Sequence, residues 1–319
     1  MRTNIFIRLS AVVCMLTAMA AAPSESLASN ITINKSNFPD DIFRQYVLNN
    51  CDADKNQSLS DQEIADVTEL LIYNMDIADL TGIGYFTALN RLICEDNKLT
   101  ALDVSNNTAL TKLDCSNNQL TALDLSHNTA LTELDCGRNQ LTALDLSHNT
   151  ALEMLWCNVN QLTSLDLSPN TALTFLCCDY NQLTALDLSH NTALTELYCT
   201  YNRISGEAMD ALIESLPVIS DGSGFDGTFC VFGLDSQEQN VVTKSQVSAA
   251  IAKGWTVLTD SYGTYEGSDG STFISSLSGD SRNLGAYDCW YDLQGRRLNV
   301  KPTSRGIYIR NGKKVILKD

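Results

Sequence analysis

The stretch LTELDCGRNQLTALDLSHNTA, residues 131–151, decides the fold, because its pattern returns every 21 residues along the middle of the chain. Five such units follow one another from Leu89, another strand-like segment begins at Leu194, and a divergent unit precedes them from Val67 to Ala88. A unit this short cannot bury its own apolar side chains, so they must pack on the same positions of the next unit. The repeat therefore predicts a stack of coils over residues 67–202.

The cysteines follow this repeat rather than a pattern of disulfide partners. Six of the 11 cysteines recur every 21 residues: Cys94, Cys115, Cys136, Cys157, Cys178 and Cys199. Adjacent strands in a sheet lie about 4.8 Å apart, so stacked cysteines fit as small buried apolar side chains. We interpret them as core residues, in preference to disulfide, metal or redox groups.

Asparagines form two further series. The first follows each strand, where an amide can satisfy backbone groups left unpaired at a bend: Asn97, Asn118, Asn139, Asn160, Asn181 and Asn202. The second marks a turn on the opposite, convex side: Asn107, Asn128, Asn149, Asn170 and Asn191. All three histidines lie beside this second turn, at His127, His148 and His190. Without converging carboxylates, we interpret them as exposed repeat residues rather than metal ligands.

The LxxLxLxxN spacing, with cysteine in the third apolar position, resembles the leucine-rich repeat. The resemblance implies an α/β solenoid, in which strand residues between the inward apolar positions face a concave surface. In the last three coils these positions change from mostly charged to mostly aromatic or apolar. The predicted partner-binding residues are Met154, Trp156, Phe175, Cys177, Tyr180, Glu196, Tyr198 and Tyr201.

Two interpretations of these concave residues stay open. Aromatic side chains and methionine dominate binding hot spots, so an exposed patch of them predicts a partner. The same residues would also suit an interface with the chain's own C-terminal segment. Cys177 is expected to point outward, but with every histidine on the other face it lacks the base that a catalytic thiol needs.

Residues 30–66 predict a helical, EF-hand-like N-terminal cap. Their loop offers the oxygen ligands expected of a calcium site: Asp52, Asp54, Asn56, Ser58, Ser60 and Glu63. Gln57 departs from the pattern, because that position normally holds glycine in a left-handed turn. Ser60 and Glu63 also fit a helix capping box, so a metal-free cap is the alternative. No cofactor other than Ca²⁺ is expected.

Beyond the repeats, residues 203–264 predict an α+β cap and residues 265–286, rich in Ser, Gly and Asp, a linker. Residues 287–319 predict a short β-rich tail, since Asn311 and Gly312 lie between apolar runs. YDLQGR from Tyr291, GIYI from Gly306 and KKVILK from Lys313 resemble the C-terminal domains of exported Bacteroidetes proteins, including type IX sorting signals. A small β module without a sorting role is the alternative.

Residues 1–22 predict a cleaved signal peptide, with two arginines before a short apolar run, so we expect a secreted or cell-surface protein with no transmembrane span. The net charge of −17 argues against nucleic acid as a partner. This charge is uneven, since residues 285–319 hold eight Lys or Arg against three Asp.

The predicted function is non-catalytic binding of a protein partner on the concave face. GxSxG, HExxH and phosphate-loop motifs are all missing from the sequence, which excludes the common enzyme classes that carry them. The whole chain resembles surface leucine-rich-repeat proteins of the Bacteroidetes, and this resemblance implies adhesion to host or bacterial surface proteins. A glycan-binding module and a purely structural surface protein are the alternatives.

Overall fold

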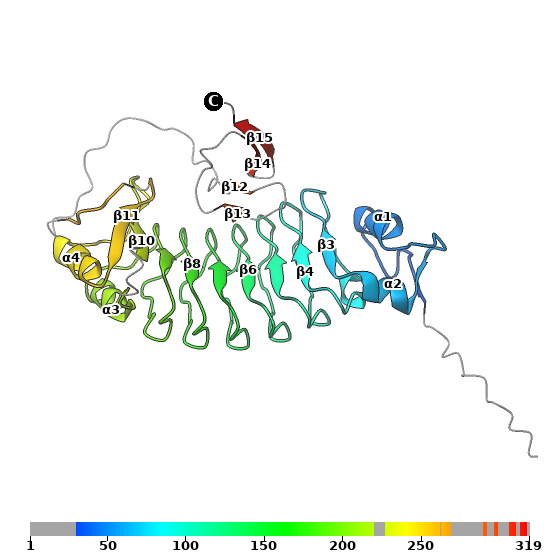
Figure 1. Ribbon diagram of the computed structural model, residues 1–319, viewed down its shortest axis with the longest axis horizontal. Coiled ribbons are helices and arrows are strands. Elements are labelled where there is room, and N and C mark those ends of the chain that lie inside the picture. Colours follow the sequence, from blue (N-terminus) through cyan, green and yellow to red (C-terminus); the bar gives the residue numbers. More distant parts are fainter. Residues whose placement is uncertain are drawn as a thin grey trace, which may run out of the picture.

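The computed structural model describes residues 30–219, 227–261 and 263–268, together with the backbone of four strands between Trp290 and Leu317. Figure 1 shows stacked coils whose strands form one continuous sheet. All nine strands of this sheet are parallel, in the order in which they follow one another in the chain. The strands are β3 (Glu69–Leu71), β4 (Arg91–Ile93), β5 (Lys112–Asp114), β6 (Glu133–Asp135), β7 (Met154–Trp156), β8 (Phe175–Cys177), β9 (Glu196–Tyr198), β10 (Gly227–Phe232) and β11 (Trp255–Thr259).

The predicted core is confirmed coil by coil. In the unit that opens this article, Leu131, Leu134 and Cys136 are each 0% exposed, and their equivalents in the neighbouring coils are buried with them. Every cysteine of the ladder has its pKa raised by desolvation. The ladder therefore packs as thiols inside the solenoid.

Both asparagine series bind backbone across coils. Asn160 Nδ2 donates to the carbonyl oxygens of Cys136 and Cys157 at 3.1 Å, and its Oδ1 accepts from the amide of Leu141 at 2.9 Å. On the convex side, Asn149 Nδ2 donates to Leu125 O at 3.1 Å and Asn128 O at 2.9 Å. Each amide thus ties two coils together, and most of these amides are buried.

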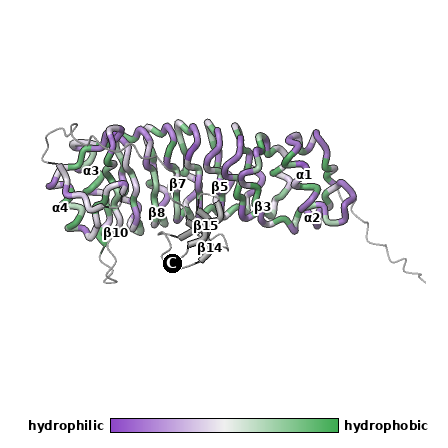
Figure 2. Tube along the Cα trace, turned by 90° about the horizontal axis from the view of Figure 1, so that it is seen from above, coloured by the Kyte–Doolittle hydropathy of each residue, from purple (hydrophilic) through white to green (hydrophobic). Residues whose placement is uncertain are grey.

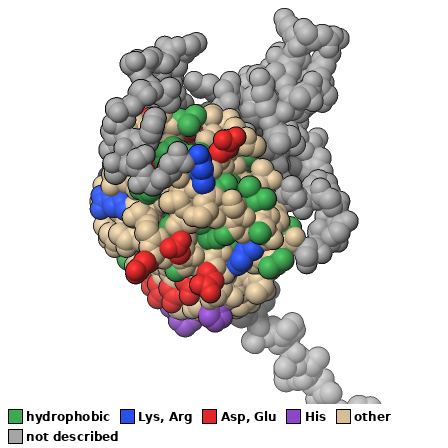
Figure 3. Space-filling view, turned by 90° about the vertical axis from the view of Figure 1, so that its left-hand side faces the viewer, with side chains coloured by type: hydrophobic (Ala, Val, Ile, Leu, Met, Phe, Trp, Pro, Cys, Tyr) green, Lys and Arg blue, Asp and Glu red, His purple; other side chains and the backbone are tan. Residues whose placement is uncertain are grey.

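All three histidines are exposed, as predicted. Figure 3, seen from the C-terminal end of the sheet, shows histidine side chains beside acidic ones along one edge. His127 and His148 contribute to the lowered pKa of Asp124, although hydrogen bonds from Ser126 are the larger cause.

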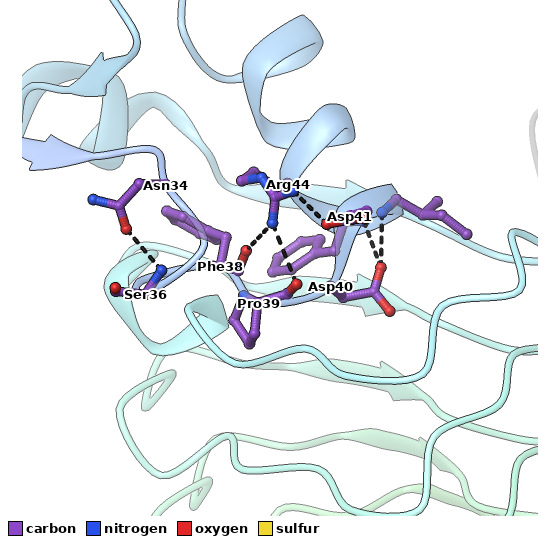
Figure 4. A network of polar contacts seen from close by, with 9 residues as sticks. Asn34, Ser36, Phe38, Pro39, Asp40, Asp41 and Arg44 are labelled. Carbon is purple, nitrogen blue, oxygen red and sulfur yellow. Dashed lines mark hydrogen bonds and ion pairs between the residues drawn. The ribbon is translucent and has the colours of Figure 1, made fainter.

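The N-terminal cap is built from β1 (Ile31–Thr32), α1 (Asp41–Asn50), β2 (Ser58–Leu59) and α2 (Asp61–Asp66), and the first coil adds a short 3-10 helix at Ile83–Tyr85. Asp40 caps α1 by accepting from the amides of Ile42 and Phe43. Figure 4 shows how Arg44 returns to this turn, where its Nη1 donates to Phe38 O at 2.7 Å. Phe38 is fully buried, so these polar contacts fix the turn that packs its side chain against the first coil.

The C-terminal cap contains both helices and strands, and its strands belong to the repeat sheet. Besides α3 (Glu207–Ser215) and α4 (Lys244–Ala252), it contributes β10 and β11, which extend the repeat sheet without a break. The predicted linker also begins later than expected, because Tyr265 N donates to Val257 O at 3.0 Å and Ser268 N to Val242 O at 2.8 Å. This returning chain covers the edge of β11, which would otherwise be open to pairing.

Asn240 explains how the sheet continues beyond the repeats. Its Nδ2 donates to Cys199 O at 2.8 Å and to Val231 O at 3.0 Å, and its Oδ1 accepts from Ile204 N. These are the bonds that the ladder asparagines make in the regular coils. A segment without the repeat motif therefore supplies the side chain that hydrogen-bonds the backbone groups of the last coil.

The tail forms a second, four-stranded sheet of β12 (Trp290–Tyr291), β13 (Arg297–Leu298), β14 (Gly306–Arg310) and β15 (Lys313–Leu317). β14 and β15 pair antiparallel with Arg310 opposite Lys313, in agreement with the predicted hairpin. The predicted signal peptide and most of the predicted linker lie outside the described residues. Among the described residues, no helix combines the length and the apolar character that a membrane crossing requires.

Candidate functional site: the strand face

The parallel register places six of the eight predicted partner-binding residues in two rows on the outer face of the sheet, here called the strand face. Met154 lies opposite Phe175, which lies opposite Glu196. In the neighbouring row Trp156, Cys177 and Tyr198 are aligned in the same way. Residues 21 positions apart in the sequence thus become nearest neighbours.

Three aromatic side chains form a continuous surface across β7, β8 and β9, here called the aromatic row. The ring centroids of Trp156 and Phe175 lie 4.6 Å apart, and those of Phe175 and Tyr198 lie 5.5 Å apart. At these separations the rings contact one another in tilted pairs. Tyr180 and Tyr201 form a separate stack, with centroids 4.0 Å apart and planes at 15°.

Not all of the predicted residues are exposed. Met154, Phe175, Tyr180, Glu196 and Tyr198 are half-buried, but Trp156 is 9% and Cys177 4% exposed. Cys177 is aligned with Trp156 and Tyr198 on the outer face, but it is not accessible there, because it lies between these two side chains and its Sγ donates to Asp179 Oδ2 at 3.4 Å. Cys177 is a buried packing residue between the two aromatic side chains.

Tyr201 belongs to the C-terminal cap rather than to an open surface. It is 6% exposed, its hydroxyl donates to Asp260 Oδ2 at 2.5 Å, and its amide donates to Glu238 Oε2 at 2.9 Å. Its ring lies against Gly233, where an added Cβ would come within 2.2 Å of the ring. The prediction of Tyr201 as an exposed residue is wrong, because the segments that follow β10 and β11 cover it.

A backbone feature that the sequence analysis missed lies beside the aromatic row. The second residue after each ladder position has a left-handed conformation in every coil. These residues are Asn74, Asp96, Asn117, Arg138, Val159, Tyr180 and Tyr201. Asparagine and aspartate tolerate this conformation, whereas a β-branched or bulky residue there is strained by roughly 1 kcal/mol. The first three coils have asparagine or aspartate at this position. Val159 and Tyr180 in later coils therefore accept backbone strain in exchange for a different side chain.

The other half of the strand face is charged and paired within itself. Arg91 forms an ion pair with Glu69, and Lys112 forms one with Glu133. These pairs join β3 to β4 and β5 to β6. The face is therefore divided into a charged half at β3–β6 and an aromatic half at β7–β9.

The loop before α2 brings the predicted calcium ligands together. Carboxylate oxygens of Asp52, Asp54 and Glu63 all lie within 4.8 Å of one another, and Asp52 is 3% exposed. Gln57 has a φ of 65°, the left-handed turn that this position requires. Asn56 Oδ1 accepts from Ser58 N at 2.7 Å.

The capping box at the start of α2 is confirmed. Ser60 Oγ accepts from the amide of Glu63, and the Glu63 carboxylate accepts from the amide of Ser60. The pKa of Glu63 is lowered first by this Ser60 amide, and the amides of Ala53 and Asp54 add to the effect. Glu63 thus closes the loop and caps the helix with one side chain.

Comparison with known proteins agrees with this architecture. The family model described as Leucine Rich repeats (2 copies) matches residues 108–148. The middle of the chain therefore contains leucine-rich repeats. Internalin J of Listeria monocytogenes serotype 4b (strain F2365) is 40% identical to it over 70 residues, which are 22% of this chain and 8% of that protein.

Solved internalin structures share the fold of this chain. The functional domain of InlJ from Listeria monocytogenes, described as including a cysteine ladder, has a TM-score of 0.51 and 32% identity, over 73% of this chain and 58% of that one. Internalin C2 from the same species has a TM-score of 0.58 and 22% identity, over 74% and 100%, which shows the fold alone. The chain spans less than two thirds of the InlJ domain and a small part of internalin J.

Proposed function

We propose that this protein is a non-catalytic binding protein, secreted or held at the outer cell surface, whose strand face recognises a protein partner. The aromatic row of Trp156, Phe175 and Tyr198 carries the proposal. Leucine-rich-repeat solenoids present extended binding surfaces, and aromatic side chains are enriched among residues that dominate binding energy. The internalin-like homologues support a surface interaction of this kind.

Comparison of the coils supports the same conclusion. The position that holds Asn117 in one coil holds Val159 and Tyr180 in later coils, although all three adopt the left-handed conformation. Strain that local packing does not require is typical of functional sites. Val159 and Tyr180 follow β7 and β8, which carry Trp156 and Phe175 of the aromatic row.

The test is a pull-down from host-cell and bacterial surface extracts with the wild type and two triple variants. One variant carries Trp156→Ala, Phe175→Ala and Tyr198→Ala, and the control carries His127→Ala, His148→Ala and His190→Ala on the convex side. We expect the wild type and the histidine variant to capture a protein that the aromatic variant loses, with all three retaining the same secondary structure by circular dichroism. Equal capture by all three would overturn the proposal, and release by free sugars would reassign the site to a glycan.

We also propose that the N-terminal cap binds Ca²⁺. The EF-hand spacing, the close approach of Asp52, Asp54 and Glu63 and the left-handed Gln57 support this second role. A bound ion would raise the melting temperature in proportion to the logarithm of its concentration. We expect Ca²⁺ to raise the melting temperature by about 5 to 10 °C, which is on the order of the shift for 1 to 2 kcal/mol in a small cap. Asp54→Ala should lose this rise. Asp61→Ala, at an exposed acid outside the ligand set, should keep it. An unchanged melting temperature at millimolar Ca²⁺ would leave the segment as a metal-free cap.

Export completes the proposal. Residues 1–22 and 287–319 carry features of a signal peptide and of a Bacteroidetes sorting segment, and both assignments rest on the sequence alone. Intact mass of the protein recovered from culture medium or from the cell surface tests both at once, because each cleavage removes a defined mass.

A further inference from the structure

We infer that the strand face is occupied by the chain's own basic C-terminal segment, residues 287–319, which a binding partner must displace. This inference rests on the proposed function, because it assigns an internal competitor to the same surface. It also gives the partner a chemistry, since whatever replaces the segment must match a surface that is aromatic and acidic.

Charge complementarity is the first support. The segment from Gly285 to the C-terminus holds eight Lys or Arg against three Asp, in a chain whose net charge is −17. Strands β3–β9 carry five acidic side chains and two basic ones, and both basic ones form ion pairs within the sheet. The strand face is therefore a negative surface, and the tail is the one strongly basic stretch of the sequence.

The aromatic row adds a second attraction. Lysine and arginine side chains bind over aromatic faces at about 0.5–2 kcal/mol, and more strongly as water is excluded. Phe175 and Tyr198 are half-buried, and their rings are in contact. The acidic residue Glu196 is the register partner of Phe175 on the neighbouring strand. A basic strand or hairpin laid across β7–β9 meets both kinds of group at once.

The connection is long enough for the segment to reach any coil. Residues 269–289 separate Ser268, which is bound to Val242, from Trp290 at the start of β12. An extended chain spans at most about 3.5 Å per residue, so this connection reaches roughly 70 Å. Nine strands about 4.8 Å apart occupy only about 40 Å. Tethering also gives the segment a millimolar effective concentration.

The backbone is arranged accordingly. Figures 1 and 2 both place the β12–β15 sheet beside the middle of the solenoid rather than beyond its C-terminal end. The buried hydrophobic cluster, in contrast, consists of residues between Ile33 and Val257. The truncated chain, residues 23–286, keeps every residue of this described cluster, and circular dichroism checks its fold before it is used.

The experiment uses carbodiimide, which joins lysine to a carboxylate in direct contact, on the monomeric full chain. We expect intramolecular cross-links from Lys313 or Lys314 to acids of the strand face such as Asp114, Asp135 or Glu196. The pair Lys313→Glu and Lys314→Glu should abolish them, and the pair Lys35→Glu and Arg203→Glu, exposed bases elsewhere, should leave them. Absence of tail cross-links in the monomer would overturn the inference.

A second measurement tests occupancy. A fluorescent peptide of residues 287–319 is titrated with the full chain, with residues 23–286, and with residues 23–286 carrying the triple aromatic-to-alanine change. We expect the truncated chain to bind at least about tenfold more tightly than the full chain, whose site is already filled. The aromatic variant and 0.5 M NaCl should each weaken binding about tenfold. Equal binding by full and truncated chains would also overturn the inference.

These outcomes separate the inference from the proposed function. If the tail neither cross-links nor binds, but the aromatic variant still loses a captured protein, the proposed partner site stands. The inference that the tail occupies this site is then wrong. If the tail binds and the truncated chain captures no protein from any extract, the surface is an internal interface and the proposed function fails.

Discussion

The second residue after each ladder position shows how one backbone conformation accommodates different side chains. All seven such residues have a φ between 51° and 55°. Asn74 and Asn117 adopt it at little cost, because their short polar side chains are tolerated in the left-handed region. Val159 adopts it with two branches at Cβ, which clash most with the backbone there. The repeat therefore imposes the conformation, and the side chain tolerates it or is strained by it.

Val159→Asn should stabilise the protein by about 1 kcal/mol, because asparagine removes the strain while the backbone hydrogen bonds of this coil remain. The reverse change in an equivalent coil, Asn117→Val, should destabilise by a similar amount. Urea unfolding at constant pH measures both. A destabilised Val159→Asn would mean that packing of the half-buried valine outweighs its backbone strain.

At the scale of the secondary-structure elements, a single acidic side chain connects the last coil to the C-terminal cap. Glu238, between β10 and α4, accepts from the amides of Tyr201 at 2.9 Å, Asn240 at 2.7 Å and Gly233 at 2.5 Å. Burial nevertheless raises the pKa of Glu238 to about 7, and these three amides oppose the shift. The carboxyl group thus connects β10 to the end of the repeats but is poorly solvated when charged.

The raised pKa of Glu238 predicts a dependence of stability on pH. Its carboxyl group binds a proton more tightly in the folded state than in the unfolded state, where its pKa is 4.5. Its contribution is therefore most favourable below pH 4.5, declines as the pH rises from 4.5 to 7, and is constant above 7. The decline is at most about 3 kcal/mol.

We expect the free energy of unfolding of Glu238→Gln to lack this decline. The informative quantity is the difference between wild type and variant at pH 5 and at pH 8, because the titration of all other groups then cancels. Glu133→Gln, at a carboxylate paired with Lys112 on the sheet, is the control and should keep the decline of the wild type, because it leaves Glu238 in place. An identical pH profile for wild type and Glu238→Gln would contradict the assignment.

At the scale of the whole molecule, the stack of coils makes stability nearly additive. Each coil contacts mainly its two neighbours, through the same leucine, cysteine and asparagine positions. Removing one full period therefore joins two coils that are already complementary. The strand face, in contrast, depends on which coils stand next to each other.

Two deletions of 21 residues separate these properties. Removal of residues 110–130 takes out a coil from the charged half, and removal of 152–172 takes out the coil that carries Trp156. Both proteins should fold with a similar circular dichroism spectrum and a melting temperature lowered by only a few degrees. Only the second should lose the captured partner, and loss by both would show that binding extends over the whole face.

The sequence by itself determined the solenoid, its 21-residue period, the buried cysteine ladder and both asparagine ladders, because a short repeat has only its own copies to pack against. It also predicted the capping box at Ser60 and the helix that follows Asp40. Each of these depends on side chains a few residues, or one period, apart.

Only the tertiary structure decided what happens where the repeat ends. Asn240 takes the place of a ladder asparagine, Tyr201 becomes part of the cap and Cys177 is buried between aromatic neighbours. β10 and β11 continue the sheet although their sequences share no period with it. The physical reason is that an open sheet edge must be satisfied by whichever backbone and side-chain groups reach it, and the chain brings those groups from 36 to 41 residues away.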